Sequence, residues 1–340
     1  MINITQEEIM QNWGVDNSTK ECTAYPICIP TLNRYEHFKN CIESLSKNKL
    51  ANETELVIGL DYPPNDKYIE GWKKIKEYIP SISGFGKITL FEHNSNLGAV
   101  ENSRFLRAYV SSKYDACIYS EDDNIFSPYF LQYINDGLRQ YKNDDSVIAV
   151  CGYSYPIDWK TEKDCVLQHQ YFSAWGYGTW INKDEDIRKK LRDAYFSKNF
   201  YSDKKMKKIK KMPANFVAFM YYCFSNVIPK YDMSSSFYMG FEEKYVLMPV
   251  KTLVTNDGWD GSGEHCIKKS GLVDFRNIQR NDNTAINVIS VESVFSYDLE
   301  RIIISLKPRF SLFKANLKYF LIKFFGIGVT KRIIQCLREV

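Results

Sequence analysis

The sequence has no cysteine pair at the spacing of a zinc site or a redox motif. Its nine cysteines are odd in number, none forms C-x-x-C, and several lie in apolar runs, such as Cys117 and Cys151. This usage excludes a disulfide framework and predicts reduced core thiols. The N-terminus also lacks a signal-peptide pattern, and the longest apolar run of the tail, "YFLIKFFGIGV", has 11 residues including a lysine, too few to span a bilayer. We therefore expect a cytoplasmic protein, either soluble or peripheral on the inner membrane face.

Strong net charge and internal repeats are missing as well. The net charge is +4 over 340 residues, which argues against a dedicated nucleic-acid binder. The charge is uneven, because residues 301–340 carry nine Lys or Arg against one acid, so the first 300 residues carry about four net negative charges. A second basic run, residues 197–213, has seven lysines and one aspartate. Hydrophobic residues make up 44% of the chain, which predicts an ordinary globular protein with a substantial core.

Strand and helix patterns alternate five times in the first half of the chain. Five short apolar runs are predicted strands, and segments with apolar residues at helical spacing lie between them. The predicted strands cover residues 25–34, 55–64, 87–94, 115–124 and 146–154. This alternation predicts an α/β fold with a Rossmann-like, mostly parallel sheet flanked by helices. Ligands of such sheets bind at the carboxyl ends of the strands.

Polar side chains collect where four of these predicted strands end. They are Asn33 and Arg34, Asp61, Asn94 and Asn96, and Glu121 to Asp123. The three adjacent carboxylates repel one another unless a cation or a partner neutralises them. Mg²⁺ or Mn²⁺, with substrate phosphates completing the coordination shell, would do so, because hard cations take oxygen ligands. For the acidic run taken alone, a solvated turn or a helix cap is the alternative explanation.

Several motifs, in order, resemble those of nucleotide-sugar-dependent glycosyltransferases with the glycosyltransferase-A (GT-A) fold. They are "PICIPTLNR", "GLD", "NSNLGAVENSR" and "YSEDDNIFSPYFLQYI". The acidic motif is similar to that of the N-acetylglucosaminyltransferase I group and its bacterial relatives. "FSAWGYGTW" and "LVTNDGWDGSGEHC" resemble the acceptor-side loop and the C-terminal segment of family-2-like bacterial surface-polysaccharide transferases. The resemblance covers about residues 25–270.

The resemblance implies roles for individual residues. Asp123 would bind Mn²⁺ or Mg²⁺, and His265 would complete the metal shell. Glu121 and Asp122 would lie near the ribose and the nucleoside, and Asp61 would accept a hydrogen bond from the base, which favours uracil. The implied nucleotide-binding residues are Pro30, Thr31, Arg34, Asp61, Arg104, Glu121 and Asp122.

The acceptor side and the catalytic base are less well marked. Residues 170–191 are expected to combine a Gly- and Trp-rich loop with a helix, and the aromatic residues of that loop would stack on a sugar, unless they form a buried cluster. These acceptor candidates are Trp175, Tyr177 and Trp180. Inverting transfer also needs a carboxylate that takes the proton of the acceptor hydroxyl. Asp232 is the first candidate, Glu242 and its neighbour Glu243 are the next, and Asp158 is a further one.

The function implied is a metal-dependent, inverting hexosyl- or N-acetylhexosaminyltransferase. It would move a sugar from a nucleotide-diphosphate donor, a UDP-sugar by preference, to a glycan or lipid-linked glycan in surface polysaccharide synthesis. One alternative is a sugar-1-phosphate nucleotidyltransferase, although "IPTLNRYEHF" lacks the glycine-rich loop expected there after the first strand. The other is a non-catalytic glycan- or membrane-binding module, which leaves the ordered acidic residues unexplained.

The predicted domain organisation separates a catalytic part from a basic tail. Residues 1–270 would form the GT-A domain, with a nucleotide-binding half (25–150) and an acceptor-side half (151–270). Residues 271–340 would be a peripheral segment followed by basic amphipathic helices. Aromatic and aliphatic residues interleaved with Lys and Arg are typical of helices lying on an anionic leaflet. A tail helix packed on the catalytic domain, with its lysines in solvent, is the alternative.

Overall fold

A computed structural model describes most of the chain. The described residues are 2–3, 24–161, 165–192, 199–224, 231–262, 280–289, 291–293, 299–301 and 311–336. The predicted metal ligand His265 lies outside them.

Packing divides the chain into two compact units. The first unit comprises residues 1–168, 173–184 and 246–293, and the second comprises 169–172, 185–245 and 294–340. Residues 185–245 thus pack with the C-terminal residues. The predicted functional boundary near residue 270 stays a prediction.

The described elements alternate as expected in the N-terminal half. The strands are β1 (Ile2–Asn3), β2 (Ile27–Thr31), β3 (Glu55–Leu60), β4 (Lys87–Glu92), β5 (Ala116–Tyr119), β6 (Asn124–Phe126), β7 (Val147–Cys151), β8 (Val166–His169), β9 (Tyr177–Trp180), β10 (Tyr245–Pro249), β11 (Val254–Asn256) and β12 (Val291–Ser293). The helices are α2 (Tyr35–Ser46), α3 (Ile69–Tyr78), α4 (Gly98–Ser111), α5 (Phe130–Gln140), α6 (Ile181–Arg192), α8 (Asp203–Ile209), α9 (Pro213–Phe224), α10 (Tyr231–Glu242) and α12 (Leu312–Cys336).

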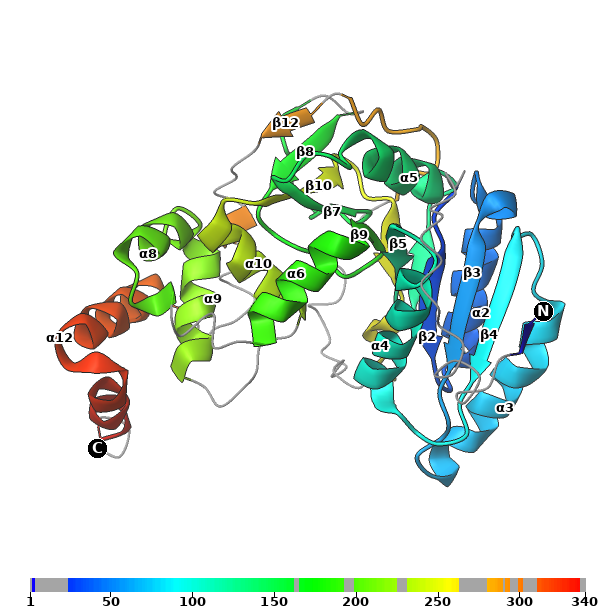
Figure 1. The fold of residues 1–340 in the computed structure, drawn as a ribbon, viewed down its shortest axis with the longest axis horizontal. Coiled ribbons are helices and arrows are strands. Elements are labelled where there is room, and N and C mark those ends of the chain that lie inside the picture. The colour runs from blue at the N-terminus through cyan, green and yellow to red at the C-terminus, as the bar shows by residue number, and fades with distance from the viewer. Residues whose placement is uncertain are drawn as a thin grey trace. The chain divides into compact units, whose positions relative to one another are not determined.

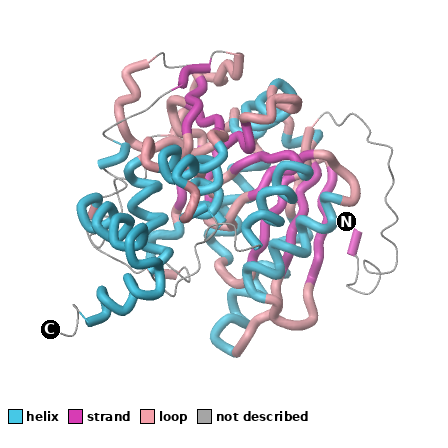
Figure 2. The backbone as a smooth tube through the Cα atoms, turned by 60° about the vertical axis from the view of Figure 1, so that its left-hand side comes forward, coloured by secondary structure: helices cyan, strands magenta, loops and turns pink. Residues whose placement is uncertain are grey.

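One large mixed sheet organises these strands (Figure 1). Its order is β1-β4-β3-β2-β5-β9-β7-β10-β8-β12. The neighbours from β1 through β5 pair in parallel, whereas β9 pairs antiparallel with both β5 and β7. A separate antiparallel pair, β6 and β11, places Asn124 opposite Asn256. The expected α/β fold with a mostly parallel sheet flanked by helices is confirmed (Figure 2).

Burial explains why the apolar runs form the centre of this sheet. Every residue of β3, β5 and β7 is buried, as expected for strands covered on both faces. Helix α2 buries Phe38, Cys41, Ile42 and Leu45, the residues that its sequence places on one face. The core cysteines Cys28 and Cys117 are free thiols, in agreement with the cysteine usage.

The Gly- and Trp-rich segment differs from its prediction as a loop. Residues 177–180 form the buried strand β9, inserted between β5 and β7. A Cβ atom at Gly178 would lie 2.5 Å from Ile134 and 2.8 Å from Leu138, both on α5. The glycine therefore allows close packing of the helix on the strand, a role that local sequence does not distinguish from a loop.

The second unit is helical. Helices α8, α9, α10 and α12 enclose an aromatic core that includes Phe216, Phe219, Phe237 and Phe241. Helix α12 is kinked at Gly326, whose φ of 73° lies in the left-handed region. Among the residues that the structure describes, no helix is both long enough and apolar enough to cross a membrane.

Candidate active site

The acidic residues after β5 lie against an arginine that follows β2. Because β2 and β5 pair in parallel, their carboxyl ends meet at one edge of the sheet. Arg34 Nη1 donates to Asp123 Oδ2 at 2.7 Å, and Arg34 Nη2 donates to Asp122 Oδ1. Both carboxylates are buried, with exposed fractions of 5% for Asp122 and 6% for Asp123. The guanidinium is therefore the cation that the described chain supplies to the acidic run.

Two further side chains complete the arrangement around these carboxylates. Thr31 Oγ1 donates to Asp122 Oδ2 at 2.8 Å, and Asn256 Nδ2 donates to Asp123 Oδ1 at 2.6 Å. Asn256 is brought there by the pairing of β11 with β6, which follows the acidic run directly. Each of the four carboxylate oxygens thus accepts at least one hydrogen bond. We call Thr31, Arg34, Asp122, Asp123 and Asn256 the strand-end cluster.

The electrostatics of the strand-end cluster favour a charged guanidinium. Burial alone would lower the pKa of Arg34, but attraction to Asp122 and Asp123 outweighs it and raises that pKa. Burial raises the pKa of Asp122, and repulsion from Asp123 adds to this, although Arg34 opposes both. The cluster contains two carboxyl groups and one guanidinium, so Arg34 is shared between Asp122 and Asp123.

Gly258 closes over the same carboxylates. A Cβ atom built on Gly258 would lie 2.0 Å from Asp123 Oδ2 and 3.2 Å from Arg34 Nη1. The backbone N–H of Asp257 donates to the carbonyl oxygen of Asp123 at 2.9 Å, which ties this turn to the acidic run. Only glycine fits here without displacing the ion pair, so the chain itself covers one side of Asp123.

Asp61 lies at the end of β3, as predicted, but its carboxylate is already engaged. It accepts hydrogen bonds from the backbone N–H groups of Tyr62 (2.9 Å), Leu97 (2.8 Å) and Gly98 (2.8 Å), and from Asn96 Nδ2 (3.2 Å). A carboxylate has about four acceptor positions, so the chain's own donors fill them. In this arrangement Asp61 joins the end of β3 to the start of α4. A nucleotide base would have to displace one of the four hydrogen-bond donors of Asp61. Asn96 is the donor that a base would displace first, because its contact is the longest.

A divalent cation fits this site only in part. Among the described residues, no group of three His, Cys, Asp or Glu side chains could hold a metal ion. Asp123 can offer one carboxylate, and Mg²⁺ often takes one or two protein carboxylates plus substrate phosphates. The guanidinium of Arg34 contacts that carboxylate, however, and would repel a cation placed beside it. A cation at Asp123 therefore requires that Arg34 turn to another anion.

The remaining predicted nucleotide and acceptor residues are spread out. Arg104 on α4 is exposed and pairs with Glu101 at 3.0 Å, so it does not belong to the strand-end cluster. Trp175 is half-buried, and its ring lies edge-on to that of Tyr153 with centroids 4.7 Å apart. Tyr177 and Trp180 are buried in β9, so these two rings fit the alternative of a buried aromatic cluster better than sugar stacking. Pro30 is half-buried within β2, and Glu121 is exposed.

Three of the candidate bases each have a local partner. Asp158 is exposed after β7 and accepts a hydrogen bond from the backbone N–H of Lys160 at 2.9 Å. Asp232 accepts one from the N–H of Met233 at the start of α10. Glu242, at the other end of α10, forms an ion pair with Lys205. Ten residues of helix separate Asp232 from Glu242 by about 15 Å, so the two cannot serve the same reacting atom.

Two members of the site were not singled out from the sequence. Asn256 and Gly258 lie in "LVTNDGWDGSGEHC", which was selected only as a motif. The same segment supplies Asp260, whose Oδ2 lies 3.0 Å from His37 Nε2. The glycine density was the available signal, since glycine often marks a close backbone approach. That Asn256 contacts Asp123 could not be predicted from the sequence, because more than 130 residues separate the two.

Comparison with known proteins shows similarity to solved structures alone. No family model and no curated protein matches the chain. TarS of S. aureus is 13% identical with a TM-score of 0.34, covering 48% of this chain and 30% of that one. TarS 1–349 in complex with UDP-GlcNAc is 14% identical with a TM-score of 0.34, covering 48% of each chain. The mannosyltransferase PcManGT from Pyrobaculum calidifontis, in complex with GDP-Man and Mn²⁺, is 12% identical with a TM-score of 0.35, covering 54% of this chain and 51% of that one.

These matches are structural similarities at 12–14% identity, and their TM-scores all lie below 0.5. The chain spans between 30% and 51% of the length of the matched structures. Similarity at this level describes part of the chain trace and does not extend to substrates or to the roles of residues.

Proposed function

We propose that this protein is a glycosyltransferase that uses a nucleoside-diphosphate sugar. The observation that carries the proposal is the strand-end cluster, in which an arginine and two buried aspartates meet at the carboxyl ends of β2 and β5. Ligands of open α/β sheets bind at this edge. A guanidinium there suits the diphosphate of a donor, since its planar donors match phosphate oxygens. The motifs "PTLNR" and "SEDDN" favour the same function.

In the proposed reaction, the bond between the anomeric carbon and the diphosphate oxygen breaks while the acceptor oxygen bonds to that carbon. A carboxylate base takes the proton of the acceptor hydroxyl, and the nucleoside diphosphate leaves with the electron pair. Arg34 exchanges its contact with Asp123 for a phosphate oxygen and so orients the leaving group. Asp122 keeps the guanidinium in place during this exchange. Thr31 fixes the carboxylate of Asp122 in turn.

A divalent cation belongs to the proposal through Asp123. Once Arg34 has turned to the diphosphate, Asp123 is the described residue that would hold Mg²⁺ or Mn²⁺. When bound, such an ion offsets negative charge on the departing diphosphate. Asn256 would keep the carboxylate of Asp123 oriented through its hydrogen bond to Oδ1.

The identities of the donor and the acceptor are proposed separately. We propose a UDP-sugar as donor and a glycan or lipid-linked glycan as acceptor, on the motif resemblance alone. Asp61 supports uracil recognition only if one of its present donors, such as Asn96, gives way. Trp175, half-buried beside Tyr153, is the acceptor-side aromatic residue that we retain.

A donor panel tests the proposal directly. The full chain is incubated with UDP-, GDP-, CMP- and dTDP-sugars, with and without Mn²⁺, and both thermal stability and release of the free nucleotide are measured. We expect one nucleoside diphosphate to stabilise the protein and its sugar donor to be hydrolysed slowly. Asp123→Ala should lose turnover, whereas Asp66→Ala, at an exposed aspartate of the same unit, should keep it. Stabilisation by no nucleotide, or full activity of Asp123→Ala, would refute the proposal.

A second incubation, with nucleoside triphosphates and sugar 1-phosphates, separates the alternatives. A sugar-1-phosphate nucleotidyltransferase would release pyrophosphate from a nucleoside triphosphate and a sugar phosphate, and a binding module would release nothing. For the base, Asp158→Asn, Asp232→Asn and Glu242→Gln are compared at saturating donor. We expect one of the three to lose turnover while it keeps donor affinity. Full activity in all three would place the base elsewhere.

A further inference from the structure

Helix α12 has two apolar faces in its first half. One face packs on the second unit, where Ala315 and Ile322 are buried in the aromatic core. The ring of Tyr319 lies against those of Phe200 and Phe216, with centroids 5.8 and 6.2 Å apart. This face is therefore covered by the core of the second unit, and the packing determines which side of the helix points outward.

The opposite face is apolar and exposed. Phe313, Leu317, Phe320 and Phe324 have exposed fractions of 77%, 48%, 57% and 67%. Their spacing of four, three and four residues places them on a single stripe. At about 100° per residue, that stripe lies half a turn away from Ala315 and Ile322. We call these four residues the outer face of α12. Exposed apolar groups of this size on one stripe mark an interaction site.

The charged residues of helix α12 itself are all positive. Between residues 312 and 336 the chain has four lysines and one arginine and no acidic residue. Lys314 and Lys323 lie about a quarter turn to either side of the stripe. Lys323 is tied to the unit by an ion pair with Asp203, and Lys314 is exposed. The surface is thus an apolar stripe bordered by ammonium groups.

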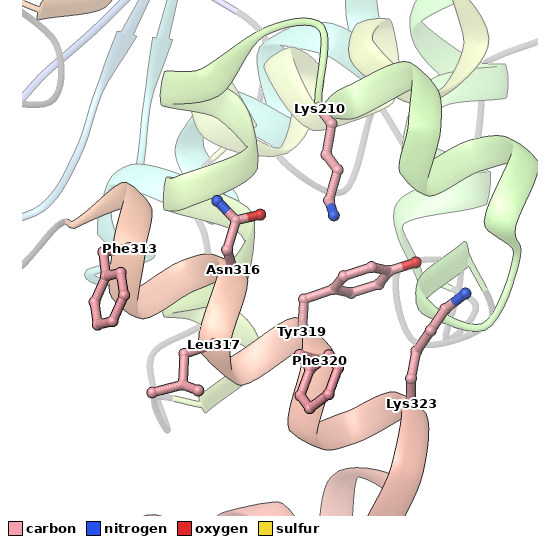
Figure 3. A pocket seen from close by; sticks show the side chains of 7 residues that line it. All are labelled: Lys210, Phe313, Asn316, Leu317, Tyr319, Phe320 and Lys323. Carbon is pink, nitrogen blue, oxygen red and sulfur yellow. The ribbon is translucent and has the colours of Figure 1, made fainter.

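A pocket beside the stripe has the same mixed character (Figure 3). Its volume is about 470 Å³, and its apolar side is formed by Phe313, Leu317 and Phe320 of the outer face. Its polar side is formed by Lys210, Asn316, Tyr319 and Lys323. In Figure 3 the three apolar side chains point away from the neighbouring helices, whereas Lys210 reaches toward the pocket from the segment after α8. An apolar side next to ammonium groups suits the boundary between lipid head groups and acyl chains.

We propose that the outer face of α12 lies on the surface of an anionic lipid bilayer, with the helix in the plane of the interface. Lysine-flanked stripes of Phe and Leu are typical of interfacial helices. The absence of acidic residues along the helix selects an anionic surface over a neutral one. Catalysis is not needed for this contact, and the inference stands or falls independently of the proposed function.

Flotation of the full chain with vesicles tests the inference. Vesicles of phosphatidylcholine alone are compared with vesicles that also contain phosphatidylglycerol. We expect binding to the anionic vesicles only, and less binding at high salt. The triple variant Phe313→Ser/Phe320→Ser/Phe324→Ser should bind at least tenfold more weakly. Ile289→Ser, which removes an equally exposed apolar side chain of the first unit, should bind as the unaltered chain does.

A charge variant tests the electrostatic part separately. Each lysine near an anionic leaflet contributes about 1 kcal/mol, or about fivefold in affinity, so Lys314→Gln should bind about fivefold more weakly. Lys47→Gln, at an exposed lysine of the first unit, is the matched control. Circular dichroism checks that each variant is folded.

Three flotation results would overturn the inference. They are absence of flotation with anionic vesicles, equal flotation of the triple serine variant, and equal binding to neutral vesicles. A dimer that forms in solution and is lost in the triple serine variant would also contradict it, because a second copy of the chain would then cover the outer face.

Discussion

Arg34→Ala should destabilise the first unit by about 3 kcal/mol. Removing one partner of a buried ion pair costs about 3–5 kcal/mol, because the other charge stays buried without compensation. Here two carboxylates lose their partner. The side chain of Arg34 is 20% exposed, against 8% for Asp122 and Asp123. Water can therefore reach part of the site, which places the expected cost at the lower end of the range.

The distribution of tryptophan makes this unit separately measurable. The five tryptophans among the described residues, at positions 72, 159, 175, 180 and 259, all belong to the first unit. Tryptophan fluorescence during urea unfolding therefore reports on that unit. With a slope of about 3 kcal/mol per molar urea, the midpoint should fall by about 1 M.

A surface ion pair supplies the control. Arg139 pairs with Asp136 at 3.1 Å, and both side chains are well exposed. Exposed pairs contribute about 0–1 kcal/mol, so Arg139→Ala should shift the midpoint little. If Arg34→Ala shifted it no more than Arg139→Ala, the strand-end cluster would not be an electrostatically coupled site.

The pH dependence distinguishes lost pairing from lost packing. In Arg34→Ala the two buried carboxylates have no cation, so their folded-state pKa values rise above the unfolded value of about 3.9. The folded state then binds more protons than the unfolded state, and stability falls as the pH rises above about 4. The deficit should be largest at neutral pH and shrink toward about pH 4. Arg34→Ala/Asp122→Asn should recover part of it, and a deficit independent of pH would refute the electrostatic explanation.

Three further predictions concern other positions. Gly258→Ala should destabilise the first unit by about 1–3 kcal/mol and abolish nucleotide-dependent stabilisation, because the added Cβ atom would lie 2.0 Å from Asp123 Oδ2. Gly328→Ala should show neither effect, because a Cβ atom at Gly328 would meet nothing within 4 Å. Burial lowers the pKa of His169 to about 3, so it contributes stability that is lost as the pH falls from about 6.5 toward 3. His169→Gln should flatten that loss in urea unfolding followed by circular dichroism, and an unchanged pH profile would contradict the burial argument. Asp61→Asn should cost about 1–2 kcal/mol in tryptophan-monitored unfolding, because its amide cannot accept from all the donors at the start of α4; stability equal to that of the unaltered chain would show that those hydrogen bonds are dispensable.

Local periodicity predicted most of the parallel half of the sheet. The runs that became β2, β3, β4 and β5 were each assigned within a few residues, because a parallel strand buried on both faces leaves a continuous apolar run. The buried face of α2 was also predicted correctly from its spacing. Strand β9 was missed, because glycine in a strand and glycine in a loop are alike in a local reading. The glycine at position 178 is explained by the close packing of α5 on β9, which is a contact between distant segments.

The sequence by itself determined that polar groups stand at the ends of the strands, since the apolar runs stop before Arg34, at Asp61 and before Glu121. Only the tertiary structure decided what each of them contacts. Arg34 neutralises the acidic run because β2 and β5 are neighbours in the sheet, and Asp61 turns to the start of α4 instead. Asn256 reaches Asp123 through the pairing of β11 with β6. The physical reason is that hydrophobic periodicity is a local property of the chain, whereas the partner of a buried charge depends on contacts between distant segments.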